Sequence, residues 1–458
     1  MASTVLEKIL SDVRKAKYFG LIVDSTPDIT HNDQLSYVLR YVDEKGDIHE
    51  RFIKFENIHG HTSAYLTLTI STLLEKLKLD MKNCVGQSYD NASNMSGKYS
   101  ELQARIKELS PKAEYVPCAT HSLNLVGVNA VESCTTAAIY FGIVQALYVF
   151  FSSSTSRWDV LKKHLLSKQK NILLKSRSQT RWSADANSVK ALYLGYNEVM
   201  LALTEIGEDN NQKIGVQFEA KELHKKLKKK EVGITTIVWN TILQRINNTS
   251  IDLQKSTINL SVIVSVYESL IAFIHDVRNS FNNIELESKS FNIDSEFCDK
   301  RKKQPPKSRM LDDIANNPGV NLSKKQDYIV NTLYVLCDKL ISELVKRNHA
   351  YKLLEQKFGF LYKNMTRPKI SNSVKLILKT YSDDLDYELV DELIQFQELK
   401  EIVFPESTSK IVDPQRQLKY LRNMDIRNTF PNIEILLQIY LTMPCTNCSS
   451  ERSISALK

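Results

Sequence analysis

The chain has 458 residues, and its 61 Lys and Arg against 53 Asp and Glu give a formal net charge of +8. Hydrophobic residues make up 42% and charged residues 25%, as is usual for a soluble globular protein, so disorder over the whole chain is excluded. Gly (13) and Pro (11) are each about half as frequent as usual, which favours long helices over hairpins. The positive charge permits a polyanionic partner without requiring one.

Cysteine usage and hydropathy limit the compartment. Cysteines number 7 and are spread along the chain, unlike a disulfide framework, so we expect a reducing compartment. The first 20 residues mix charged with apolar side chains, which excludes a signal peptide. The uncharged run from Ser133 to Ser156 has a strongly apolar part of about 15 residues, shorter than the roughly 20 that cross a bilayer. We expect a buried helix there and no membrane partner.

The first third of the chain predicts a small sheet that follows Met1 almost at once. Period-two alternation and turn residues predict an antiparallel meander of three strands, and Thr62 and Ser63 cap the helix after it. The predicted elements, in chain order, are strands at 18–24, 34–43 and 48–57, a helix in 61–79, a strand at 83–90, a loop and helix in 91–109, and a short strand in 113–118.

From about Ala119 the strand signal fades and helical spacing dominates. Apolar residues keep this spacing over many turns in the segments 186–206, 251–277, 328–348 and 385–403. The stretch from about 292 to 325 is basic around residues 300–307 and predicts a flexible loop. A second lysine cluster spans residues 225–230. Such runs are usually solvated faces, although residues 300–307 also fit a nuclear signal or a phosphate contact.

Two acids stand at predicted strand ends. A meander followed by αβαβα is the order of the ribonuclease-H-like fold, in which the ends of the first and fourth strands lie side by side. Asp24 and Asp90 occupy those ends. Two adjacent carboxylates can hold a hard divalent cation such as Mg²⁺, usually with a third carboxylate from elsewhere. The alternative is that both are ordinary turn residues at strand ends.

Several segments together resemble one family. They are VDSTPD, GQSYDNASNMSG, PCATHSLNLV, LYVFFSSSTSRWDVL, SQTRWSADANSVKAL and FPNIEILLQIYLTMPCTNCSSERSISALK. In this order, over nearly the whole chain, the sequence resembles the hAT superfamily of DNA transposases and, more closely, transposase-derived zinc finger MYM-type-like proteins.

The resemblance implies an α/β ribonuclease-H-like core with a mixed sheet, interrupted by a large all-α insertion. Residues 1–156 would form the N-terminal part of the core and residues 157–425 the insertion, including the loop at about 292–325. Residues 426–458 would be a hAT C-terminal dimerisation segment that completes the core.

The resemblance also implies a DDE active site. Asp24, Asp90 and Glu451 match the three catalytic acids, which would hold two Mg²⁺ ions for DNA strand cleavage and transfer. On its own, Glu451 is also what the first turn of a Ser-capped helix favours. Both roles are compatible.

Four further residues match DNA-contacting positions of the family. Cys118 and His121 match a C-x-x-H motif near the active site, while Arg181 and Trp182 match a motif whose Trp stacks on a flipped base. Without the resemblance, these would be a buried thiol, a helix-start histidine and a core tryptophan. Cys445-x-x-Cys448 is an isolated pair and a weak metal signal, so no zinc is expected.

Two functions remain open from the sequence. We find no zinc finger before the core, and Lys458 falls inside the helix begun near Glu451, so we expect a chain truncated at both ends. Three intact acids favour a hAT-type transposase core, a polynucleotidyl transferase. The missing ends favour a domesticated or degenerate descendant that binds nucleic acid and dimerises without catalysis. Either reading implies DNA as partner, a homodimer through the C-terminal segment, and a nuclear location.

Overall fold

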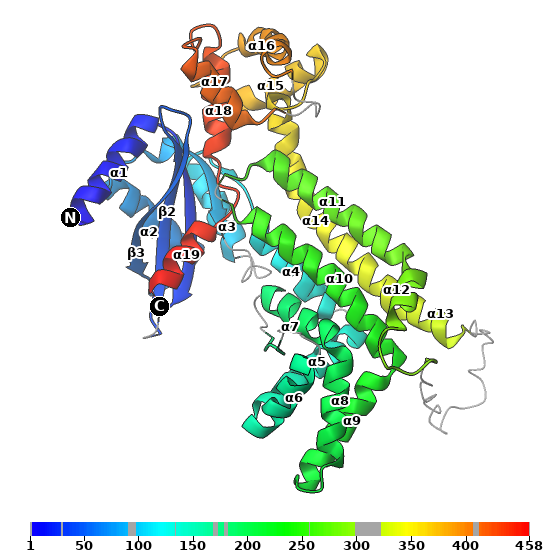
Figure 1. Ribbon diagram of the computed structural model, residues 1–458. Coiled ribbons are helices and arrows are strands. Elements are labelled where there is room, and N and C mark those ends of the chain that lie inside the picture. Colours follow the sequence, from blue (N-terminus) through cyan, green and yellow to red (C-terminus); the bar gives the residue numbers. More distant parts are fainter. Residues whose placement is uncertain are drawn as a thin grey trace, which may run out of the picture. The chain divides into compact units, whose positions relative to one another are not determined.

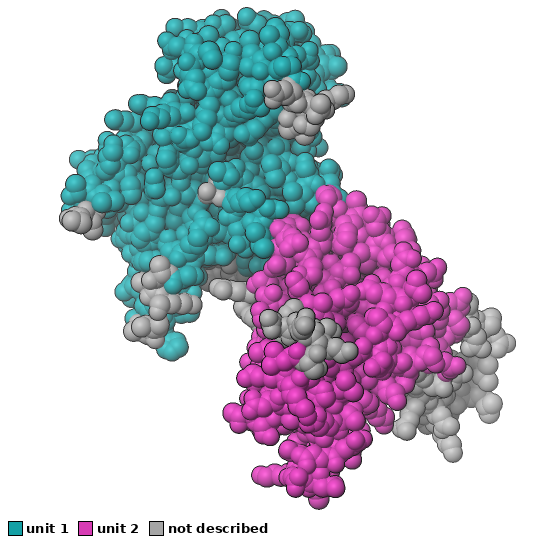
Figure 2. Space-filling model, viewed as in Figure 1, with its two compact units in different colours: residues 1–125, 250–268, 346–458 teal, residues 126–249, 269–345 magenta. Residues whose placement is uncertain are grey.

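The computed structural model describes residues 2–28, 31–89, 98–132, 134–167, 173–177, 182–255, 257–297, 322–405 and 412–457. The chain forms two compact units, coloured separately in Figure 2. Unit 1 comprises residues 1–125, 250–268 and 346–458, and unit 2 comprises residues 126–249 and 269–345. These units place residues 126–156 with the helices of unit 2 and residues 346–425 with the sheet. The division into domains at residues 156 and 425 stays a prediction.

Unit 1 contains a mixed five-stranded sheet with the order β3-β2-β1-β4-β5. The strands are β1 (Phe19–Pro27), β2 (Asp33–Val42), β3 (Ile48–Asn57), β4 (Cys84–Tyr89) and β5 (Glu114–Tyr115). Strands β1, β2 and β3 form an antiparallel meander, whereas β4 lies parallel to both β1 and β5. The structure thus confirms the predicted meander and the adjacency of the first and fourth strands.

The helices of the described residues are shown in Figure 1. They are α1 (Ala2–Ala16), α2 (Ser63–Lys76), α3 (Lys98–Leu109), α4 (Ala119–Glu132), α5 (Thr135–Ser152), α6 (Thr155–Ser167), α7 (Trp182–Leu194), α8 (Tyr196–Glu208), α9 (Ile214–Lys228), α10 (Lys230–Leu253), α11 (Leu260–Asn279), α12 (Phe281–Ser288), α13 (Lys324–Tyr328), α14 (Val335–Phe358), α15 (Arg367–Tyr381), α16 (Leu389–Val403), α17 (Pro414–Asn423), α18 (Pro431–Thr442) and α19 (Cys448–Leu457). Short 3₁₀ turns lie at Met81–Asn83 and Gly359–Leu361, and a π-helical segment at Ile329–Tyr334.

Three expectations about helices need correction. The sheet does not follow Met1 at once, because α1 comes first and buries Leu10 and Val13, spaced for one helix face. The segment 186–206 is two helices, since Gly195 separates α7 from α8 and packs against Leu165. The segment 251–277 is also divided. In its break, the Asn259 side chain accepts a hydrogen bond (3.2 Å) from the backbone N–H of Val262 at the start of α11.

The apolar run predicted as a buried helix forms α5. By length and composition, α5 and α11 are both long and apolar enough to cross a membrane. Within unit 2, α5 buries aromatic side chains that include Tyr140, Phe141 and Phe150. The packing of these buried side chains accounts for the hydrophobicity of α5. The basic part of the predicted loop at 292–325 lies outside the described residues.

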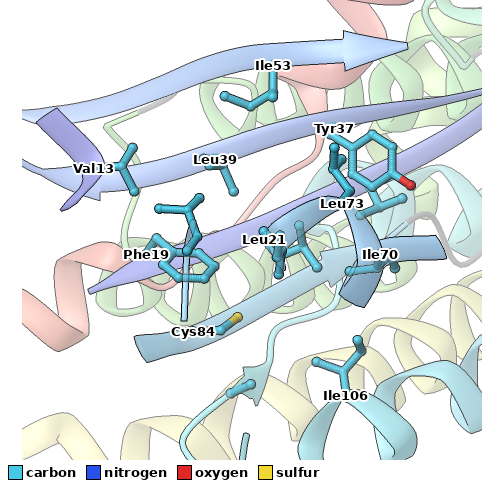
Figure 3. Close-up of a cluster of buried hydrophobic side chains, with 14 of the residues drawn as sticks. Val13, Phe19, Leu21, Tyr37, Leu39, Ile53, Ile70, Leu73, Cys84 and Ile106 are labelled. Atoms are coloured by element: carbon cyan, nitrogen blue, oxygen red, sulfur yellow. The ribbon is translucent and has the colours of Figure 1, made fainter. Parts of the chain in front are cut away.

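One face of the sheet packs on helices of the N-terminal part. Alternate residues of β1 and β2, among them Leu21 and Leu39, point into a cluster with Val13 of α1, Ile70 of α2 and Ile106 of α3 (Figure 3). Strand alternation directs the intervening residues to the opposite face. Helices α1, α2 and α3 therefore leave that second face to another part of the chain.

The second face is covered by the C-terminal segment. Gly20 of β1 and Gly86 of β4 are register partners on adjacent strands. A Cβ atom at Gly20 would lie 2.4 Å from the Thr442 carbonyl oxygen, and one at Gly86 would lie 2.7 Å from Cδ of Pro444. Both distances are shorter than atoms tolerate. The two glycines thus form a flat platform on which residues 442–444 lie directly against the sheet.

We expect Gly86→Ala to lower the free energy of unfolding by about 1–3 kcal/mol, because its methyl group overpacks the contact with Pro444. Gly60→Ala is the matched control in unit 1, since a Cβ there would meet Tyr65 at an ordinary 3.5 Å. Urea unfolding followed by circular dichroism measures both. Equal midpoints for the two variants would show that the glycine platform does not carry the C-terminal segment.

Candidate acidic site

Asp24 lies within β1 and not at its end as predicted, because pairing with β2 continues to Pro27; it is on the face covered by the C-terminal segment. Strand alternation places it on the same face as Gly20. Its register partner on β2 is Ser36, whose hydroxyl donates a hydrogen bond to the Asp24 carbonyl oxygen (3.1 Å). Beside it, Val23 pairs with Tyr89, the last described residue of β4. Asp90, the predicted second acid, lies outside the described residues.

Glu451 lies in the first turn of α19. The Asn447 carbonyl accepts the backbone N–H groups of Ser450 (2.9 Å) and Glu451 (3.1 Å), which starts the helix. The Ser450 hydroxyl is hydrogen-bonded to that of Ser36. Because Ser36 uses its one proton on the Asp24 carbonyl, Ser450 is the donor in this bond. The structure therefore joins the turn that carries Glu451 to the residue directly opposite Asp24.

The two described acids are suited to a hard cation. Asp24 and Glu451 are both half-buried, and carboxylates that keep access to water can share a divalent cation with water ligands. Within the residues that the structure describes, no three His, Cys, Asp or Glu side chains are arranged to hold a metal ion. Since Asp90 is outside those residues, the predicted triad stays a prediction. Two of its members belong to neighbouring elements at one end of the sheet.

The C-x-x-H segment packs beside this turn. Cys118 is buried, and its thiol donates to the Asn447 side-chain oxygen (2.6 Å). The Ala119 backbone N–H donates to the Cys445 carbonyl (3.1 Å). Tyr267 holds the same segment from α11, because its hydroxyl donates to the Ala119 carbonyl (2.9 Å). Cys118 and the helix start that carries His121 thus adjoin the residues just before Glu451. Their DNA-contacting role stays a prediction.

The isolated pair Cys445 and Cys448 lies against the same segment, which spacing along the chain does not reveal. Burial raises the pKa of the Cys445 thiol to about 11, and burial also raises the pKa of Cys448. The pKa of Cys118 is raised well above its usual value by burial. All three thiols are therefore protonated at neutral pH, which makes them unreactive as nucleophiles. Their contacts are structural, as in the hydrogen bond from Cys448 to Thr120 (3.6 Å).

Trp182 begins α7 in unit 2 and is buried, with 5% of its surface exposed. Its indole stacks on Trp239, with ring centroids 6.0 Å apart, and meets Phe141 edge-on at 6.3 Å. A Cβ at Gly127 would lie 2.1 Å from this indole, so the ring occupies the space that the glycine leaves. This is the packing expected of a core tryptophan. Arg181 lies outside the described residues, and base stacking by Trp182 stays a prediction.

Sequence reasoning missed several residues that shape the site. Ser36, Arg40, Glu50 and Ser449 contact each other or the C-terminal segment, and nothing in their spacing indicated it. The glycines gave a usable signal, because an isolated glycine in a strand often marks a close approach of another backbone.

Two regions of the chain match known families. Residues 1–101 match the family DUF4371, described as "ZMYM1/FAM200, RNase-like domain". Residues 395–458 match the "hAT family C-terminal dimerisation region". Over 291 residues the chain is 24% identical to the "52 kDa repressor of the inhibitor of the protein kinase" of Homo sapiens, covering 62% of this chain and 38% of that protein. The Mus musculus protein of the same name is 28% identical over 152 residues, 33% of this chain and 20% of that protein.

In both matched regions the chain is similar to hAT transposase-derived proteins. It spans less than two fifths of the length of these two curated relatives. The first matched region contains Asp24 and Asp90, and the second contains Glu451. The two matched regions are therefore those that the glycine platform and the Ser36–Ser450 bond hold together.

We expect Trp182→Ala to lower the free energy of unfolding of unit 2 by about 3–5 kcal/mol, because it leaves a large cavity beside Trp239. Trp158→Ala is the control, since Trp158 is only half-buried and should lose less. The remaining tryptophans of each variant lie in unit 2, so their fluorescence during urea unfolding reports on it. An unchanged midpoint with weakened DNA binding would instead favour base stacking.

Proposed function

We propose that the chain has a ribonuclease-H-like core whose acids Asp24, Asp90 and Glu451 bind divalent cations for DNA strand cleavage and transfer. One observation carries the proposal. The first turn of α19 is hydrogen-bonded, through Ser450, to the register partner of Asp24, so acids from the two ends of the chain adjoin one end of one sheet face. A structural role alone does not require carboxylates at both places.

Each group has a defined part in this proposal. When bound, two Mg²⁺ ions supply an activated water or 3′-hydroxyl and stabilise the leaving oxygen. Asp24 and Glu451 would hold the ions from β1 and from α19, with Asp90 as the third carboxylate. The sheet and the C-terminal segment hold β1 and the first turn of α19, which carry Asp24 and Glu451, in place before DNA binds. Such fixed placement is what lets charged ligands act without reorganising during the reaction.

A second candidate is a self-associating nucleic-acid-binding factor without catalysis. Two curated relatives are named as a repressor, and residues 395–458 match a dimerisation region. In unit 2, the end of α9 exposes Lys225, Lys226 and Lys228, suited to phosphate contacts. Trp182 is packed in the core. These observations fit a protein that keeps DNA contact and dimerisation.

For either candidate we propose a nuclear location. A fluorescent fusion with and without Lys302 and Lys303 replaced by Ala would test it.

We expect the chain to nick supercoiled DNA in the presence of Mg²⁺, and Asp90→Ala to reduce the rate at least a hundredfold, because one carboxylate of the ion cluster is lost. Gel conversion of supercoiled to open-circular DNA measures both rates. Asp28→Ala is a control on an acid that directly follows β1 and is not one of the three predicted ligands.

Cleavage at equal rates by the wild-type chain and Asp90→Ala would reject the catalytic proposal. Salt-dependent DNA retention without cleavage, with a dimeric mass in light scattering, would support the second candidate.

A further inference from the structure

A buried ion pair lies on the sheet face that bears Asp24. Arg40 of β2 and Glu50 of β3 are register partners, with Nη1 2.7 Å from Oε1. Their side chains are only 1% and 2% exposed. Removing two charges from water is costly, and a well-packed apolar pair of similar size is often as stable. Stability alone therefore does not explain an ion pair at this position.

The pair contacts both sides of the bend between α18 and α19. Arg40 Nε donates to the Leu441 carbonyl (2.9 Å), near the end of α18. Oε2 of Glu50 accepts a hydrogen bond from the Ser449 hydroxyl, in the first turn of α19. The buried pair thus spans residues 441–449 and fixes the entry of α19 onto the sheet.

Two neighbouring hydroxyls then set the rotation of α19 about its axis. Ser449 bonds to Glu50 on β3, and Ser450 bonds to Ser36 on β2. Successive residues of an α-helix point about 100° apart, because the helix has 3.6 residues per turn. Two directional hydrogen bonds from side chains that point about 100° apart allow the helix only one rotational setting about its axis. The direction in which Glu451, the next residue, leaves the helix is thereby fixed.

We propose that Ser449, held by the buried Arg40–Glu50 pair, is a positioning residue that orients Glu451 toward Asp24 for binding a hard divalent cation. The inference rests on the proposed acidic site and adds the device that orients one of its ligands. Apolar packing against the glycine platform holds the segment on the sheet, but it does not specify rotation. The hydrogen bonds supply that specificity because they depend on direction.

The test is binding of Mn²⁺ alone to the full chain, followed by electron paramagnetic resonance of the free ion. We expect Ser449→Ala to weaken Mn²⁺ binding about tenfold, the usual effect of losing a group that orients a metal ligand. Ser449→Thr keeps the hydroxyl and should restore the affinity. Ser455→Ala is the matched control, because it removes an exposed hydroxyl from the same helix.

A second variant tests the buried pair without leaving a lone charge. Arg40→Met combined with Glu50→Leu replaces both charges by apolar side chains and is expected to fold. It should weaken Mn²⁺ binding as Ser449→Ala does, because the partner of Ser449 is gone. Urea midpoints of all variants, measured in parallel, confirm folding.

The inference is overturned if Ser449→Ala or the double variant binds Mn²⁺ like the wild type, or if Ser449→Ala and Ser455→Ala lose equal affinity. Failure of Ser449→Thr to restore binding would also overturn it, since a hydroxyl would then not be what matters. The variant Asp24→Asn distinguishes failure of the acidic site from failure of the positioning role of Ser449. If Asp24→Asn abolishes binding while Ser449→Ala does not, the acidic site stands without this positioning role. If the wild-type chain binds no Mn²⁺, both fall.

Discussion

The contact of residues 442–444 with Gly20 and Gly86 joins the two ends of the chain. Without side chains at these positions, backbone and Pro444 can lie directly on the adjacent strands β1 and β4. Everything proposed for the acidic site depends on this approach, because it brings α19 to the strand that carries Asp24. A side chain on either strand would lift the segment and, with it, Glu451.

The same contact gives the matched dimerisation region a role within the monomer. Most side chains of α18 and of the bend after it are buried in unit 1, among them Leu436, Leu437 and Met443. The region described as a dimerisation region therefore contributes core packing and one predicted acid. The exposed apolar side chains of this region include Ile402 of α16 and Met424 after α17.

The strands and their order could be predicted from the sequence, whereas the segment that covers the second face of the sheet could not. Alternation in β2 places Leu39 in the core, and by the same rule it assigns Arg40 to solvent. The rule fails here because a segment from the other end of the chain covers that face and pairs Arg40 with Glu50. Local patterns carry no information about such a distant partner. The prediction of Glu451 as the third acid came from the family resemblance. Helix α1 was not predicted, although its apolar residues have helical spacing.

In the proposed site, acids from both ends of the chain share one cation. Anomalous diffraction from crystals of the full chain soaked in Mn²⁺ tests it most directly, because the ion itself reports its ligands. We expect an anomalous peak within coordination distance, about 2.0–2.4 Å, of carboxylate oxygens of both Asp24 and Glu451. A peak bound by neither acid, or none at saturating Mn²⁺ with both carboxylates ordered, would contradict it.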